Sequence, residues 1–236
     1  MKLVLATHNQ GKVRELSEML SNGYQLSAIK TDNRQPRGSP YGLHTVDYEC
    51  HTRIRTLIPT NAHRIEVISL KSYPNAPEVV EDGATYTENA IKKASVIAEY
   101  TGHLALADDA GLEVNALNGA PGVNSKRWVG EDATDAQRVA SLLKVLEGVT
   151  DRRARFIAAI AVVHPDTVPK VVIGVCEGRI TYAPAGQSGF GYDPIFVPNG
   201  YEQTFAELGE KIKNQISHRA NALQQALALI YGKPEK

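Results

Sequence analysis

The sequence has 236 residues, of which 42% are hydrophobic and 22% are charged, and these values are ordinary for a globular protein with a sizeable core. Lys and Arg (26) balance Asp and Glu (26), which argues against a protein that binds nucleic acid through its phosphates. The two cysteines exclude a disulfide framework, and no apolar run approaches the roughly 18 residues of a membrane-spanning helix. We therefore expect a cytoplasmic α/β protein that binds neither nucleic acid nor membranes.

The first predicted element is a strand–loop–helix unit. Leu3–Ala6 is a short apolar run, typical of a strand that is covered on both faces. The polar stretch Thr7–Lys12 interrupts it, and apolar residues then recur at helical spacing, at Val13, Leu16 and Leu20. The loop could present Asn9, Lys12 and backbone N–H groups to a phosphate at the helix start. An ordinary strand–helix turn would have the same pattern.

The next part of the chain, at about residues 27–64, has no sustained hydrophobic period and collects Pro and Gly. Unstructured loops of this length are uncommon within compact domains. We therefore interpret it as an inserted segment.

The central part of the chain combines two predicted helices with two acidic motifs. Thr85–Glu88 and Thr134–Gln137 have the pattern of capping boxes, so each predicts a helix start. Between them, the strand Leu104–Ala107 is expected to end at Asp108-Asp109, and Glu81-Asp82-Gly83 is a similar acidic turn. Adjacent carboxylates at the end of a buried strand could bind Mg²⁺, although turns with solvated carboxylates have the same sequence.

The last third of the chain predicts a hairpin and a closing helix. Phe156–Val163 and Val168–Val175 are β-rich runs around a turn, which indicates a mixed sheet. The aromatic residues of the glycine-rich stretch Phe190–Pro194 could stack on a base. One face of the closing helix carries Ile216, Ala220, Leu223, Leu227 and Ile230. His218 and Arg219 fall off that face, so both can point away from the core.

Taken in order, these motifs closely resemble the inosine triphosphate pyrophosphatase family, the dITP/XTP pyrophosphatases that remove non-standard purine nucleotides. The resemblance covers Met1 to about Gly23 and about Glu66 to Tyr231. The matching stretches are Leu5–Lys12, Val80–Gly83, Glu88–Ala90, Ala107–Leu112, Gly119–Val123, Gly189–Phe196 and Ile216–Arg219.

The resemblance implies an elongated, two-lobed single α/β domain over residues 1–236, with a mixed central β-sheet flanked by helices and an inserted segment at about 27–64. It also implies a homodimer that uses Mg²⁺ to hydrolyse ITP, dITP and XTP to the monophosphate and pyrophosphate.

The resemblance further implies a role for individual residues. Glu81 and Asp109 would hold Mg²⁺, and Asp109 would accept the proton of the attacking water. The triphosphate would be held by Thr7, Asn9, Lys12 and Lys93. Phe190 and Tyr192 would enclose the base, and its polar edge would be read by Asp193, Lys213, His218 and Arg219. The other expected substrate-binding residues are His8, Gln10, Gly11, Ala110 and Gly191.

Two alternative functions stay open at this point. A Maf-type pyrophosphatase would catalyse the same reaction on other bases, although Ser217-His218-Arg219 favours a purine. A nucleotide-binding protein with impaired turnover would follow if His8, Ala110 or the inserted segment spoils the geometry.

Overall fold

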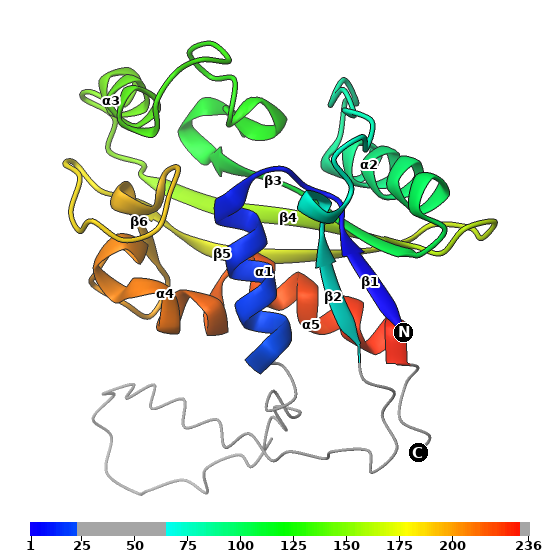
Figure 1. Cartoon of the computed structure of the whole chain (residues 1–236). Coiled ribbons are helices and arrows are strands. Elements are labelled where there is room, and N and C mark those ends of the chain that lie inside the picture. Colours follow the sequence, from blue (N-terminus) through cyan, green and yellow to red (C-terminus); the bar gives the residue numbers. More distant parts are fainter. Residues whose placement is uncertain (23–64, 232–236) are drawn as a thin grey trace, which may run out of the picture.

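A six-stranded mixed β-sheet forms the centre of the computed structural model, which describes residues 1–22 and 65–231 (Figure 1). Across the sheet, the strands are β2 (Glu66–Ser69), β1 (Lys2–Leu5), β3 (Leu104–Val114), β4 (Arg153–Val163), β5 (Lys170–Ile180) and β6 (Phe196–Pro198). β1 pairs in parallel with β2 and β3, and the remaining pairs are antiparallel. The prediction of an α/β fold with a mixed sheet is confirmed, whereas the inserted segment at about 27–64 lies outside the described residues.

Helices cover both faces of this sheet. α1 (Gln10–Asn22) and α5 (His218–Tyr231) pack on one face, and α2 (Tyr86–Thr101) packs on the other. α3 (Asp135–Val145) and α4 (Phe205–Ile216) lie at the β6 end of the molecule (Figure 1). Short 3₁₀ turns occur at Leu70–Ser72, Asn115–Leu117, Gly122–Asn124 and Asp193–Ile195. Among residues 1–22 and 65–231, no helix is long and apolar enough to cross a membrane.

The hydrophobic core is divided between two lobes that share β3 and β4. In the first lobe, Leu106 of β3 packs with α1 and α5 on one face of the sheet, and Ala107 packs with α2 on the other. In the second lobe, Leu112 of β3 and Phe156 of β4 pack with α3, β6 and Phe205 of α4. The middle of β3 therefore lies between the cores of the two lobes.

β3 does not end at Asp108-Asp109, so the predicted strand boundary is wrong. The strand continues through both carboxylates, and Asp108 and Asp109 lie opposite Ile160 and Ala159 of β4. Successive side chains of a strand point to opposite faces of the sheet. Asp108 therefore faces α1 and α5, as Leu106 does, whereas Asp109 faces α2. The two carboxylates do not form one acidic cluster.

The predicted closing helix corresponds to α5, except that Ile216 lies before its start. Ile216 is the last residue of α4, and Ser217 begins α5 by accepting a hydrogen bond on Oγ from Ala220 N (3.2 Å). The sequence analysis also missed α4, although Thr204 and Glu207 form a complete capping box at its start; the helix contains a backbone kink at Gly209, whose φ is 76°.

The two predicted helix starts are present, with one difference in detail. At α3, Thr134 and Gln137 form the complete capping box. At α2, Thr85 Oγ1 accepts from Glu88 N (3.1 Å), but Glu88 Oε2 accepts from Ala84 N (2.7 Å) rather than from Thr85 N. Glu88 thus holds the residue before the cap.

α5 packs closely on β5 at Gly174. A Cβ at this position would lie 2.1 Å from His218 O and 2.4 Å from Ala222 N, so only glycine fits without movement. The same helix supplies side-chain donors to the open edge of β5, because Asn221 Nδ2 and Gln225 Nε2 each lie 2.8 Å from a β5 carbonyl. This contact fixes the start of α5, where His218 and Arg219 are located.

We predict that Gly174→Ala destabilises the protein by about 1–3 kcal/mol, because the added methyl group must displace the backbone of α5. Urea denaturation followed by circular dichroism measures the change. An unchanged denaturation midpoint would show that α5 can move away from β5 at no cost.

Candidate active site

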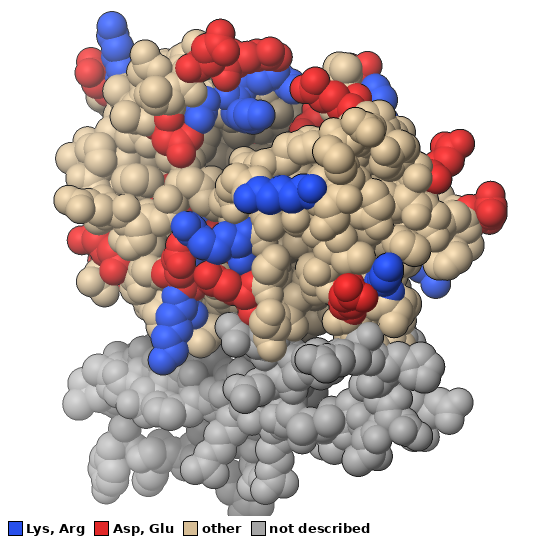
Figure 2. All heavy atoms as spheres, in the orientation of Figure 1, with Lys and Arg blue, Asp and Glu red and all other residues tan. Residues whose placement is uncertain are grey.

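A cavity of about 820 Å³ opens between the two lobes. Its lining includes Asp109 and Ala110 in the middle of β3, the loop after β1, the segment before α2 and the glycine-rich loop around Phe190. In Figure 2, Lys and Arg atoms line a hollow between α3 and α2 on this face of the molecule. A concave site with basic walls favours an anionic ligand.

With one exception, the residues singled out in the sequence line this cavity. The exception is Gln10, whose side chain turns back and donates to His8 O (3.1 Å). The predicted residues in the lining are Thr7, His8, Asn9, Gly11, Lys12, Glu81, Lys93, Asp109, Ala110, Phe190, Gly191, Tyr192, Asp193, Lys213, His218 and Arg219.

The loop between β1 and α1 forms one wall of the cavity. Thr7 Oγ1 accepts from Asn9 N (3.2 Å), and Asn9 Oδ1 accepts from Lys12 N (3.2 Å), so the loop is held by its own side chains. Lys12 Nζ lies 3.3 Å from Asp108 Oδ2. Burial lowers the pKa of Lys12, although the charge of Asp108 opposes this change. The loop thus presents a lysine and a helix N-terminus, the combination that the phosphate hypothesis requires.

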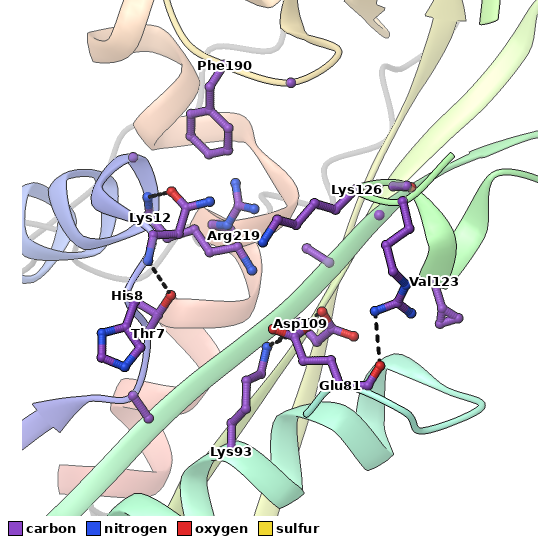
Figure 3. A pocket seen from close by; sticks show the side chains of 18 of the residues that line it. Thr7, His8, Lys12, Glu81, Lys93, Asp109, Val123, Lys126, Phe190 and Arg219 are labelled. Atoms are coloured by element: carbon purple, nitrogen blue, oxygen red, sulfur yellow. Dashed lines mark hydrogen bonds and ion pairs between the residues drawn. The ribbon is translucent and has the colours of Figure 1, made fainter. Parts of the chain in front are cut away.

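Glu81 and Asp109 lie close to each other beside Lys93 (Figure 3). Lys93 Nζ lies 3.2 Å from Glu81 Oε2 and 3.6 Å from Asp109 Oδ1, and Asn89 Nδ2 donates to Asp109 Oδ2 (3.0 Å). Burial raises the pKa of Asp109, and the charge of Glu81 adds to the increase, while Lys93 offsets part of it. Burial acts in the same direction on Glu81, but Lys93 and Lys12 bring the pKa of Glu81 below its usual value. The two carboxylates therefore differ in proton affinity.

Asp108 pairs with basic side chains on the opposite face of the sheet, the face covered by α1 and α5. Its side chain is fully buried, and Arg219 Nε donates to Oδ2 (2.9 Å), close to Lys12. Lys93 reaches the same residue from the α2 side, because its Nζ donates to Asp108 O (2.7 Å). Burial alone would raise the pKa of Asp108, but Lys12 and Arg219 hold the pKa well below its ordinary value. Asp108 is thus neutralised by basic side chains of the protein itself.

Phe190 and a buried group of ions form the opposite end of the cavity. Lys213 Nζ lies 4.5 Å from the centre of the Phe190 ring, 2.5 Å from Asp193 Oδ2 and 2.6 Å from Glu15 Oε1. Arg219 NH1 donates to Glu15 Oε2 (2.9 Å). Burial raises the pKa of Asp193, although Lys213 opposes the increase. An aromatic face beside fixed N–H and carboxylate groups can recognise a flat heterocycle with a polar edge.

His218 and Arg219 are buried, which overturns the expectation that they point away from the core. They are 2% and 5% exposed. The ring of His218 stacks on Phe156 with centroids 4.7 Å apart, and burial together with Arg219 lowers the pKa of His218 well below its model-compound value. The expectation rested on the position of both residues off the apolar stripe of the closing helix, but in the first turn of α5 their side chains are buried where they line the cavity.

Two acidic residues of the site, Glu15 and Asp135, were missed in the sequence, and a third, Asp108, was not assigned to the face of the sheet on which it lies. Glu15 lies one helical turn after Lys12 on α1, so their shared face was a usable signal. Asp108 was read together with Asp109, although strand alternation separates them. Asp135 begins α3, and its Oδ2 accepts from Gly191 N (2.7 Å) in the loop that carries Phe190. No local pattern pointed to this long-range bond.

Comparison with known proteins finds a matching family model and relatives that align with nearly the whole chain. Residues 49–229 match the model of the Ham1 family. The chain is 44% identical to a dITP/XTP pyrophosphatase of Desulforamulus reducens, covering 98% of this chain and 96% of the relative. It is 41% identical to a dITP/XTP pyrophosphatase of an Exiguobacterium species, covering 98% and 97%.

Two solved structures resemble the whole chain. The Ham1 protein of Staphylococcus aureus aligns with a TM-score of 0.74 at 32% identity, covering 99% of this chain and 100% of that one. A HAM1 protein from Coxiella burnetii aligns with a TM-score of 0.73 at 37% identity, covering 98% of both chains. The fold seen here is thus shared along the full length of these structures.

We predict that Asp108→Asn destabilises the protein at pH 7 by about 3 kcal/mol, because the variant leaves buried cations without their counter-charge. The folded pKa of Asp108 lies below its unfolded value, so the stabilisation is present above about pH 4 and is lost as the pH falls further. Denaturant unfolding of both proteins between pH 3 and pH 7 measures this. A stability difference that does not narrow at low pH would contradict the assignment.

Proposed function

The chain belongs to the Ham1 family, and on that premise we propose that it hydrolyses the non-standard purine nucleotides ITP, dITP and XTP to the monophosphate and pyrophosphate. The names of its relatives, dITP/XTP pyrophosphatases, support this substrate class. The observation that carries the proposal is the arrangement of one cavity, in which two carboxylates and two lysines lie at one end and Phe190 lies at the other. A nucleotide likewise has charged phosphates at one end and a flat base at the other, so it matches both ends of the cavity.

Cation positions in the cavity support binding of the triphosphate. Lys12 and Lys93 enter from different elements, α1 and α2, and both contact Asp108. Catalysis of phosphoryl transfer rests mainly on positioning and on neutralising the developing charge. In this proposal the two lysines and the N-terminal loop of α1 hold the phosphates against Asp109.

The donor set at Glu81 and Asp109 fits Mg²⁺. This ion commonly takes one or two carboxylates and completes its shell with water and substrate phosphates. Glu81 and Asp109 supply two close carboxylates, and the raised pKa of Asp109 indicates that additional positive charge is favourable there. When bound, Mg²⁺ would neutralise phosphate charge. No larger cluster of metal-ligating side chains occurs in residues 1–22 and 65–231, which suits an ion that shares its ligands with a substrate.

Asp109 is the proposed general base. Its Oδ2 is fixed by Asn89 Nδ2, and its Oδ1 faces Lys93. A carboxylate with a fixed orientation inside the cavity can reach the proton of a bound water, which is the geometric requirement for a general base. In the proposed reaction, Asp109 takes the proton of the water that attacks the phosphorus atom.

Base selectivity would come from the polar groups around Phe190. Lys213 and Arg219 carry N–H donors at this end, and Asp193 supplies an acceptor. Donors that face the 6-oxo group of hypoxanthine would face the amino group of adenine instead. An unpaired buried polar group costs about 1–3 kcal/mol, so adenine is disfavoured.

The proposal extends to the oligomeric state and the cellular location of the protein. We expect a homodimer, which light scattering after size-exclusion chromatography would measure, and we expect a cytoplasmic location.

We predict that Asp109→Asn lowers the rate of pyrophosphate release by about 10²–10⁴-fold, because an amide cannot accept the proton. The wild type is first tested with ITP, dITP, XTP, ATP and UTP, each with and without Mg²⁺. Asp151→Asn serves as the control, because Asp151 is an aspartate outside the cavity that pairs with Arg153. A near-normal rate in correctly folded Asp109→Asn would refute the role of Asp109.

We predict that kcat/KM for ITP exceeds that for ATP by about 10²-fold or more, as expected from mismatched buried donors. Arg219→Ala should reduce this ratio more than it weakens inhibition by pyrophosphate. Arg14→Ala, which removes an exposed arginine of α1 paired with Glu210, is the matched control. Equal use of ITP and ATP by the wild type would contradict the proposed base site, and preference for a pyrimidine would favour the Maf-type alternative.

A further inference from the structure

A segment of the second lobe is hydrogen-bonded to both ends of the cavity. At the base end, Tyr192 Oη donates to Ser125 O (2.9 Å) and Gly191 N donates to Asp135 Oδ2 (2.7 Å). At the carboxylate end, Arg127 NH1 donates to Glu81 O (3.0 Å). Residues 125–135 therefore connect the loop of Phe190 with the segment that carries Glu81.

Glu81 lies in a segment with little support of its own. No helix or strand covers residues 73–85, between the 3₁₀ turn at Leu70–Ser72 and α2. After Glu81, the chain is tied to α2 by Gly83 N, which donates to Asn89 Oδ1 (2.8 Å). For the main chain of residues 77–81, the bond from Arg127 is the one hydrogen bond within the described parts of the chain. Arg127 therefore holds the backbone of Glu81, while Lys93 contacts its side chain. Lys92 pairs with the next residue, Asp82.

The geometry of Arg127 suits a holding role. Its guanidinium reaches two neutral acceptors, Glu81 O and Asn124 Oδ1 (3.4 Å), and it forms no ion pair within residues 1–22 and 65–231. A planar guanidinium can bond two acceptors in fixed directions, which a lysine cannot do. The hydrogen bond to Asn124 orients the guanidinium of Arg127, and the hydrogen bond to Glu81 O holds the segment before α2.

We propose that Arg127 is a positioning residue that holds Glu81 in place for the divalent cation, from the opposite side of the cavity. This inference rests on the proposed function, because it assigns a cation to Glu81 and Asp109. Partners that orient a metal ligand typically change metal affinity about 10–100-fold when they are removed. Arg127 acts through Glu81, and its substitution should affect metal binding before it affects nucleotide binding.

The test compares Arg127→Gln and Arg127→Lys with the wild type. Mn²⁺ is titrated by electron paramagnetic resonance without nucleotide, and the Mg²⁺ concentration for half-maximal pyrophosphate release from ITP is measured separately. We expect Arg127→Gln to weaken both by about tenfold or more, with KM for ITP at saturating Mg²⁺ within about twofold of the wild type. Arg127→Lys keeps the charge and one donor, so its loss should be smaller.

Amide hydrogen exchange of residues 77–83 without metal supplies a readout that does not depend on activity. These amides should exchange faster in Arg127→Gln, because the segment loses its bond to the opposite side. Arg153→Gln is the matched control, since Arg153 is an exposed arginine that pairs with Asp151 outside the cavity. It should leave Mn²⁺ affinity and exchange unchanged.

Two outcomes would overturn the inference. Unchanged Mn²⁺ affinity and exchange in Arg127→Gln would show that Glu81 is held without Arg127. A large rise in KM for ITP with unchanged Mn²⁺ affinity would instead assign Arg127 to direct contact with the substrate. Failure of the wild type to hydrolyse any of the nucleotides would refute the proposed function, and the Mn²⁺ and exchange measurements would still decide whether Arg127 positions Glu81.

Discussion

The site depends on how the fold neutralises the cations that it buries. Lys213 and Arg219 are almost completely buried, and a buried cation without a counter-charge is strongly unfavourable. Glu15 and Asp108 supply that charge from α1 and β3, while Arg219 comes from α5. Because Lys213 comes from α4, four elements of the fold are thus joined by one set of ion pairs. The same pairs leave the N–H groups of these cations at fixed positions around the cavity.

The two faces of β3 carry carboxylates with different roles: Asp108 neutralises buried cations, and Asp109 lies beside Glu81 in the cavity. Asp108 faces α1 and α5, where basic side chains neutralise it and its pKa stays low. Asp109 faces α2, where burial and Glu81 raise its pKa. The pKa values of two neighbouring carboxylates are therefore shifted in opposite directions, because their side chains lie on opposite faces of the strand. Lys93 links the two faces, since it contacts the main chain of one residue and the side chain of the other.

The sequence predicted the mixed sheet, the first helix and the β4–β5 hairpin, because these features depend on local periodicity. The resemblance to the pyrophosphatase family supplied a set of site residues that, apart from Gln10, line the cavity, but about half of the lining was not predicted. Prediction from the sequence failed where tertiary contacts override a local pattern. Asp108-Asp109 was taken as a strand end because two carboxylates rarely lie within a buried strand. Here Lys12 and Arg219 neutralise Asp108, and Asn89 and Lys93 contact Asp109. His218 and Arg219 were expected to point away from the core because they fall off the apolar stripe of the closing helix, yet both side chains are buried. Glu81 O and Arg127 are 46 residues apart, and no spacing rule reports such a bond.

The continuous pairing of β3 with β4 through the two aspartates also limits how the gene can change. A strand alternates its side chains with a period of two, so the gain or loss of one residue between Leu104 and Asp108 would turn every later side chain to the other face. An insertion would bring Asp108 to the position beside Lys93 and Glu81. A deletion would bring Asp109 to the position beside Arg219 and Lys12. Ala110 would then take the position beside Lys93 and Glu81. Substitutions in this strand can be compensated one at a time, whereas a single-codon insertion or deletion exchanges both faces at once. The length of the first half of β3 is therefore under a stricter constraint than its composition.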